Sequence, residues 1–141
     1  MGRIAAVLSL ALVVGASIRP AFAHHSAAVY DFDRRWEIAG VVKAIRVMNP
    51  HVTLTLLVAG RQGTRTVEFE GHSVNNFYRV GWRPHMIEPG DRIEVIFAPR
   101  KDHLAGGYVT GFVTAHGRVI RFTMPGVSGI KPVPAEFARS S

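Results

Sequence analysis

Residues 51–72 read HVTLTLLVAGRQGTRTVEFEGH, and this stretch predicts a β-hairpin. Apolar and polar side chains alternate on both sides of the dipeptide Arg61-Gln62. A period of two residues is typical of strands that bury one face and expose the other. The glycines that flank the dipeptide suit a tight turn. We therefore expect strands over residues 51–58 and 64–70, joined by a two-residue loop.

The register of this hairpin follows from the same alternation. With that loop, Leu56 faces Val67 and Thr55 faces Glu68, so apolar side chains meet apolar ones and polar side chains meet polar ones. A slip of one residue would turn Glu68 toward the core, and packing rejects it. A slip of two residues keeps the pattern, so this alternative stays open.

The rest of the chain predicts further short strands and a single short helix. We expect strands over residues 36–47, 93–97, 108–114 and 119–122. In the strand over residues 93–97, the alternation points Ile93 inward and Ile96 outward. After Ser73, a helix would place Val74, Phe77 and Tyr78 on one face and end at Gly81. Three strands, a helix and two more strands is the order of the OB-fold. We therefore expect an all-β fold with one short helix, a small OB-fold-like barrel of five or six strands; a β-sandwich is the alternative, which the helix disfavours.

The N-terminal residues have the three parts of a secretory signal. Arg3 supplies a positive start, residues 4–18 an apolar run, and Ala21 with Ala23 the small residues that a signal peptidase reads. The run is shorter than the roughly 20 residues of a membrane span. We therefore expect export to the periplasm, cleavage after Ala23 and no membrane span in the mature protein.

Cleavage would leave 118 of the 141 residues, the length of one small domain. We expect residues 24–35 to form an N-terminal arm, residues 36–123 the barrel, and residues 124–141 a disordered tail rich in proline and glycine. Tyr30 and Trp36 could line a ligand surface, but aromatic residues at the start of a strand usually belong to the core.

Composition narrows the range of partners. There is no cysteine, which excludes disulfides, thiolate nucleophiles and thiolate metal sites. Loss of Arg3 and Arg19 lowers the formal net charge from +7 to +5. A periplasmic protein rarely meets nucleic acid, so we expect no nucleic-acid partner. The electrostatic partners expected of a basic surface are anionic lipid, polysaccharide or an acidic protein face. An anion patch could form from Arg79, Arg83, Arg100 and Lys101, but scattered single charges are usually solvated surface. Solubility alone is the simpler interpretation of the net charge.

Several short motifs together resemble a known family. These are the Ala23-His24-His25-Ser26 junction, a strand from Gly40 to Asn49-Pro50-His51, Gly81-Trp82, and Pro89-Gly90-Asp91. In order and spacing they are similar to the small exported bacterial proteins of domain-of-unknown-function family 6152, over nearly all of the mature chain up to Phe122. The resemblance implies export and a small β domain, and it implies no activity and no catalytic residue. The chain departs from the pattern at Ala27-Ala28 and in its proline-rich end.

The hairpin register predicts one candidate metal site. It sets His51 opposite His72 on the polar face, with Glu70 on the same face, and directly paired Cβ atoms lie about 5 Å apart. Two imidazoles and one carboxylate can hold a transition metal. The alternative is that histidines at strand ends only cap loops or face solvent.

The cleaved terminus predicts a second placement. His24 would become the first residue, and its amine and imidazole together can chelate copper(II), with His25 adding another imidazole. The alternative is a plain, mobile arm. Whether His24 and His25 share one site with His51 and His72 stays open.

No catalytic constellation is present in the sequence. Its serines lie in no nucleophile elbow, and the chain has neither a glycine-rich phosphate loop nor a His-Glu-x-x-His helix. We therefore expect no enzyme, but an exported binding or accessory protein with copper or another transition metal as ligand. The alternatives are a carbohydrate- or peptide-binding module on the polar face of the hairpin, or a protein–protein interaction module of an envelope complex.

Overall fold

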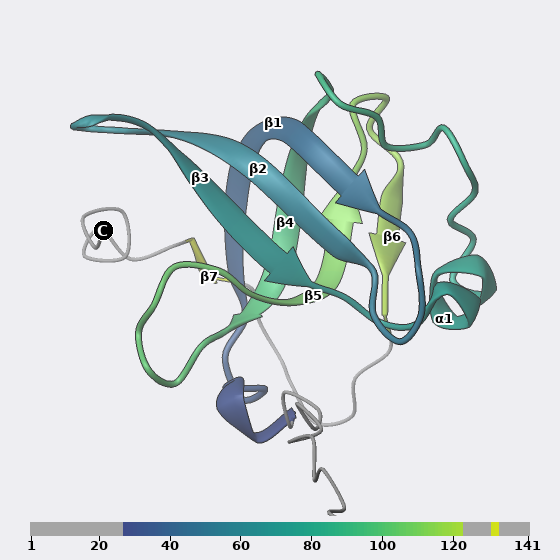
Figure 1. Ribbon diagram of the computed structural model, residues 1–141, viewed down its shortest axis with the longest axis horizontal. Helices are drawn as coiled ribbons and strands as arrows, with labels where there is room; N and C mark the ends of the chain where they lie inside the picture. The colour runs from purple at the N-terminus through teal and green to yellow at the C-terminus, as the bar shows by residue number, and fades with distance from the viewer. Residues whose placement is uncertain (1–26, 123–130, 133–141) are drawn as a thin grey trace, which may run out of the picture.

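The fold is that of a computed structural model, which describes residues 27–122 and 131–132 (Figure 1). The described elements are, in chain order, the 3-10 turn η1 (Ala27–Val29), β1 (Trp36–Arg46), β2 (Thr53–Gly60), β3 (Gly63–Glu70), the helix α1 (Val74–Arg79), β4 (Arg92–Pro99), β5 (Gly107–Val113), β6 (Val119–Arg121) and β7 (Lys131–Pro132). Within these residues no helix is long and apolar enough to cross a membrane.

Five of the strands close into a barrel. β1 pairs antiparallel with both β2 and β4, β2 with β3, and β4 with β5. The parallel pairing of β3 with β5 completes the ring. This order, with α1 between β3 and β4, confirms the expected OB-fold-like barrel. Of the short strands, β6 extends the sheet beside β5, and β7 pairs in parallel with β1.

The hairpin register is the predicted one. Thr53 pairs with Glu70, Leu54 with Phe69, Leu56 with Val67, and Gly60 with Gly63 across the two-residue loop. The slip of two residues that the sequence left open is therefore excluded. β2 begins at Thr53, two residues later than expected, so His51 and His72 lie just beyond the ends of their strands.

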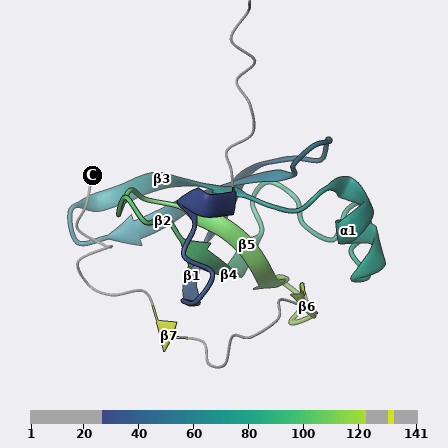
Figure 2. The ribbon, with the colours of Figure 1, turned by 90° about the horizontal axis from the view of Figure 1, so that it is seen from below.

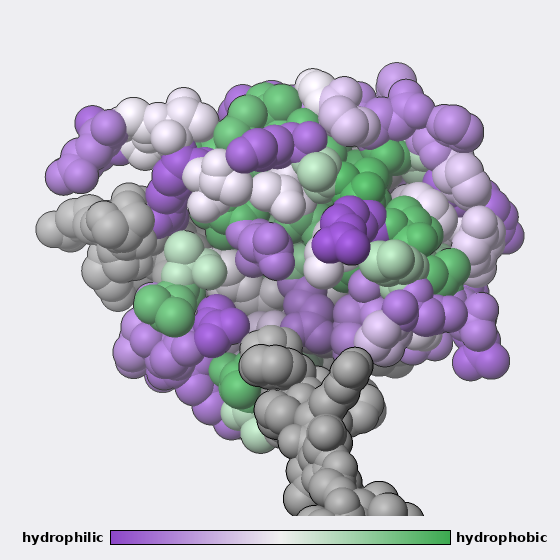
Figure 3. Space-filling model, viewed as in Figure 1, coloured by the Kyte–Doolittle hydropathy of each residue, from purple (hydrophilic) through white to green (hydrophobic). Residues whose placement is uncertain are grey.

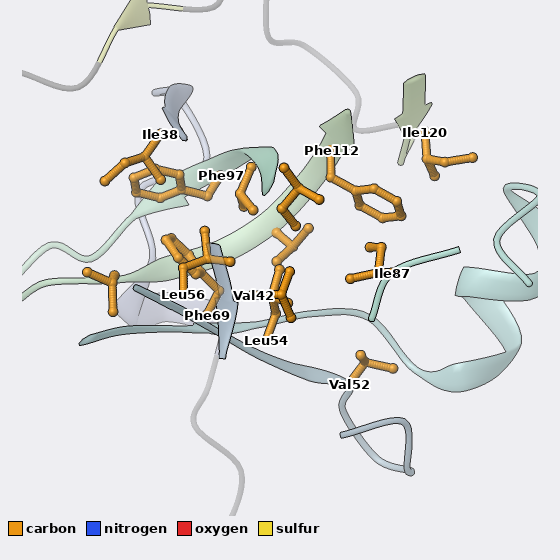
Figure 4. Close-up of a cluster of buried hydrophobic side chains, with 14 of the residues drawn as sticks. Ile38, Val42, Val52, Leu54, Leu56, Phe69, Ile87, Phe97, Phe112 and Ile120 are labelled. Carbon is orange, nitrogen blue, oxygen red and sulfur yellow. The ribbon is translucent and has the colours of Figure 1, made fainter. Parts of the chain in front are cut away.

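The barrel interior is filled by the apolar positions of the alternating strands (Figure 4). Leu56, Phe69, Phe97 and Phe112 are completely buried. Phe69 and Phe97 meet edge to face at a centroid separation of 4.9 Å, an arrangement that aromatic pairs prefer. Trp82, from the loop after α1, also belongs to this core.

Two side chains differ from the sequence prediction. Ile96 on β4 is buried although the alternation turns it outward, because it lies against Gly111 on β5, where the missing side chain leaves room. Tyr78 is 41% exposed and does not share the buried face of Phe77. The helix buries Phe77, whereas the ring of Tyr78 lies at the barrel surface against Trp82, at a centroid separation of 5.6 Å.

The segment before β1 lies on the barrel. Asp31 N donates to Pro99 O at 2.8 Å, Lys101 N donates to Val29 O at 2.9 Å, and Tyr30 forms a bridge with Arg100 between them. Tyr30 is only 5% exposed. The expected arm is thus attached to the end of β4 from Val29 onward. The predicted signal, His24 and His25 lie outside the described residues. The expected tail also lies outside them, apart from β7.

Glycines permit the closure of the barrel. Gly106 has φ +107°, and a Cβ there would collide with the backbone oxygen of Glu68. A Cβ on Gly107 would collide with the backbone oxygen of Ala98 and with the ring of Phe97. Here β5 runs so close to β3 and β4 that no side chain fits.

Substitution Gly106→Ala should therefore destabilise the fold strongly. Left-handed strain costs an L-residue about 1–2 kcal/mol, and the backbone collision should raise the loss in the free energy of unfolding to about 3 kcal/mol or more. Gly90→Ala is the matched control, because Gly90 has φ +97° and nothing within 4 Å of an added Cβ. Urea denaturation of both variants measures the difference, and equal losses would show that the collision is relieved at little cost.

Candidate functional site

A polar pocket opens on the barrel surface beside β2 and β3. It has a volume of about 350 Å³. Its lining comes from both strands, from the segment before β1 and from the loop between β4 and β5: Tyr30, His51, Thr53, Glu68, Glu70, Arg100, Ala105 and Gly107. The polar face of the hairpin thus forms one wall, and the point of barrel closure forms another.

Glu70 lies at the centre of the polar contacts. Its Oε2 accepts a 2.6 Å hydrogen bond from the hydroxyl of Tyr30, and its Oε1 lies 3.3 Å from Nδ1 of His51. Burial and the adjacent Glu70 carboxylate raise the pKa of Tyr30 far above its ordinary value, so the hydroxyl keeps its proton and donates. Both carboxylate oxygens of Glu70 therefore have a partner within the site.

The contacts of His51 define its tautomer. Its Nδ1 lies 3.1 Å from the backbone oxygen of Gly71 as well as close to Glu70. A carbonyl oxygen can only accept, so Nδ1 carries the proton. The Nε2 atom of the neutral ring then keeps its lone pair. Metal-binding histidines commonly have this arrangement, in which a carboxylate or carbonyl orients the ring from the far side.

His72 has a different environment, although it follows β3 by only two residues. Its ring stacks on Phe122 at a centroid separation of 4.3 Å and meets the edge of Tyr108 at 4.9 Å. The ring of His51 also lies near Tyr108, at a centroid separation of 6.5 Å, so the two imidazoles have this tyrosine as a common neighbour. Burial, and secondarily the repulsion that a protonated His51 would exert, lower the pKa of His72, which favours the neutral form of its ring.

The structure thus unites part of the predicted metal constellation. It brings His51 and Glu70 together in the pocket and leaves His72 outside the pocket lining. Over residues 27–122, no group of three or more His, Cys, Asp or Glu side chains is arranged to hold a metal ion. His24 and His25 are not among the described residues.

Tyr30 and Arg100 line the pocket, although the sequence favoured a core position for Tyr30 and solvated surface for Arg100. Tyr30 is buried, as expected of an aromatic residue before a strand, but its hydroxyl reaches the site. Arg100 donates through Nε to Asp102 at 2.9 Å, and this ion pair compensates its charge. The pocket wall therefore keeps a negative balance from Glu68 and Glu70, in a chain whose formal charge is +7.

The acid sensitivity of the fold should depend on His72. Its pKa in the native state lies below the ordinary 6.5, so the native state binds fewer protons than the unfolded chain as the pH falls through that value. The stabilisation from neutral His72 is complete above about pH 6.5 and decreases below it.

Substitution His72→Phe should make stability less dependent on pH between about 8 and 5, because an apolar ring fits between Phe122 and Tyr108 and does not titrate. Thermal unfolding over this range measures the effect. His116→Phe is the control, since His116 is exposed in a turn. A parallel pH dependence in wild type and His72→Phe would contradict the assignment.

Comparison with known proteins gives one match. Neither a curated protein nor a solved structure matches the chain significantly. A family model matches residues 11–109, which is more than half of the chain and includes the hairpin, α1 and the closure glycines. The protein therefore belongs to the family of unknown function DUF6152.

Proposed function

We propose that this protein is an exported, non-enzymatic accessory protein that binds a transition metal ion, copper(II) foremost. In this proposal His51 is the ligand from the barrel and Glu70 orients it. His24 and His25 of the cleaved terminus supply the remaining nitrogen ligands. The observation that carries the proposal is the chain of contacts from Tyr30 through Glu70 to His51 at one pocket.

The first support is the orientation of His51. Its protonated Nδ1 contacts Glu70 Oε1 and the Gly71 carbonyl, which leaves Nε2 as the coordinating nitrogen. Glu70 is fixed in turn by Tyr30. An imidazole held in one tautomer loses little freedom when it binds a metal. The acidic balance of the pocket wall favours a cation.

The second support is the attachment of Tyr30 to the pocket. Six positions separate Tyr30 from His24. At about 3.3 Å per residue, this chain spans up to roughly 20 Å. A terminus at His24 is therefore within reach of His51, and one site can take ligands from both predicted clusters.

The ligand set favours copper. A terminal amine, the imidazole of the same residue and the imidazoles of His25 and His51 form a nitrogen-rich set, which suits copper(II) in tetragonal geometry. The barrel alone supplies too few ligands for a closed site. The terminus, which only cleavage creates, would complete it.

The size and lining of the pocket also support a second candidate function. About 350 Å³ lies within the range of small-molecule sites. Thr53, Glu68 and Arg100 offer donors and acceptors of the kind that hold a sugar or a short peptide. Binding that survives a chelator would favour this candidate over the metal.

Residues that hydrogen-bond a metal ligand typically contribute about 10- to 100-fold to metal affinity. Substitution Glu70→Gln should therefore weaken copper(II) binding within that range, whereas His51→Ala, which removes the ligand itself, should weaken it by more. Competitive titration against a chromophoric chelator measures both affinities. His72→Phe is the matched control, because His72 does not line the pocket. An unchanged affinity in a folded His51→Ala variant would show that the barrel supplies no ligand to the metal.

Exported protein that begins at His24 should bind copper(II) more tightly than protein with one glycine added before His24. The added residue displaces the amine from its chelate with the His24 imidazole. Mass spectrometry of the periplasmic protein under native conditions reports the true terminus and any retained metal. Equal affinities of the two forms would exclude the terminal amine as a ligand.

A further inference from the structure

A basic surface with exposed apolar side chains forms one end of the barrel. It combines Arg46, Val47 and Met48, at the end of β1 and in the loop that follows, with Tyr78, Arg79 and Arg83 of α1 and its C-terminal loop. We call these six residues the basic end. A hydrogen bond from Val74 N to Asn49 Oδ1, 3.2 Å long, joins the loop to the start of α1. Figures 1 and 2 both show this loop beside α1.

The basic end has few acidic neighbours along the chain, and the first acidic residue after Arg83 is Glu88. Residues 43–51, 71–87 and 103–122, which supply the β1–β2 loop, the helix region and the β5–β6 hairpin, contain no Asp or Glu. In the described part of the chain, no salt bridge joins Arg46, Arg79 or Arg83 to a carboxylate. Arg118 of the β5–β6 turn adds a further cation, because its Nη2 lies 3.4 Å from the backbone oxygen of Gly81.

The guanidinium of Arg83 is held by the helix end. Its Nη1 donates to the backbone oxygens of Tyr78 at 2.9 Å and Trp82 at 2.7 Å, and its charge lies 5.5 Å from the centre of the Tyr78 ring. These neutral acceptors position the cation without cancelling its charge. The basic end therefore presents at least one fixed positive charge to a partner.

Large apolar side chains are exposed within the same surface. Met48 is 51% exposed, Tyr78 41% and Val47 39%. Figure 3 shows hydrophobic atoms over the β1–β2 loop and beside α1, next to strongly hydrophilic ones. Apolar tips surrounded by arginines are typical of surfaces that enter the headgroup region of a bilayer, where rings and aliphatic chains reach the acyl boundary and cations contact anionic lipids.

We propose that the basic end docks on the surface of an anionic lipid membrane. The arginines of the basic end, which form no salt bridge within the described residues, supply the charge complementarity. Val47, Met48 and Tyr78 supply apolar contact that nucleic acid phosphates would not use. An acidic protein would need carboxylates at matching positions, whereas a charged lipid surface needs only the sign of the charge. This inference does not depend on metal binding.

The test is co-sedimentation of the exported protein with vesicles of phosphatidylcholine, with and without phosphatidylglycerol. Protein purified after export, with its terminus verified by mass spectrometry, should sediment only with the anionic vesicles, and added salt should release it. Equal binding to neutral vesicles would indicate simple apolar adsorption and overturn the proposal, as would no binding to either.

Matched variants assign the surface. Each cation near an anionic membrane contributes about fivefold in partitioning, so Arg46→Ser with Arg79→Ser should reduce binding about 25-fold. The control is Arg61→Ser with Lys101→Ser, which removes the same charge from the β2–β3 turn and the β4–β5 loop, away from α1 (Figure 1). Equal reductions in the two pairs would mean that only net charge matters, and the proposal would fail.

The apolar contribution has its own pair of variants. Met48→Ser should weaken vesicle binding, whereas Leu104→Ser, which changes a residue 60% exposed in the β4–β5 loop, should not. A labelled single-stranded oligonucleotide tests the competing partner class. The proposal would be overturned in favour of nucleic acid if the wild-type protein bound the oligonucleotide but no vesicles, and if the Arg46→Ser, Arg79→Ser variant lost that binding.

Discussion

The parallel pairing of β3 with β5 is the contact on which the rest of this structure depends. All other barrel pairs are antiparallel, and three of them join strands that follow one another in the chain. The β3–β5 pair is parallel and joins the end of β3 to a strand that begins about forty residues later. It forms because Gly106 and Gly107 bring the chain against the backbone of β3 and β4 without side chains. Because the chain has no cysteine, no disulfide can fix that approach.

The closure also produces the pocket. Phe69 pairs with Gly107 and Glu70 with Tyr108, so the step that completes the barrel brings Glu70 beside the β4–β5 loop and sets Tyr108 against both His51 and His72. Tyr30 reaches Glu70 because residues 29–31 run along the end of β4. The fold therefore orients the imidazole of His51 at the pocket and packs that of His72 among aromatic rings, although both residues flank the same hairpin.

Local periodicity explains which features could be predicted from the sequence. The register of β2 and β3, the order of the strands and the position of α1 depend on alternation and on turn residues near in sequence, and these predictions are confirmed. The different surroundings of His51 and His72 depend on Tyr108, Phe122 and Tyr30, which are distant in the sequence, and no local pattern encodes them. The exposure of Tyr78 could not be predicted in this way, because its spacing from Val74 and Phe77 is that of one apolar helix face. It depends on how α1 lies against the barrel.

The contacts of Glu70 change the kind of site that the barrel can provide. A carboxylate with both oxygens engaged, one by Tyr30 and one by His51, is better suited to orient a ligand than to bind the metal itself. The barrel then offers one well-oriented nitrogen and a negative wall, which is an incomplete site. Under the proposed function, the missing ligands become available only when the signal is removed, because an uncleaved chain has an amide where the amine is needed. Metal loading would in that case be restricted to the exported protein, and no separate regulatory element would be required.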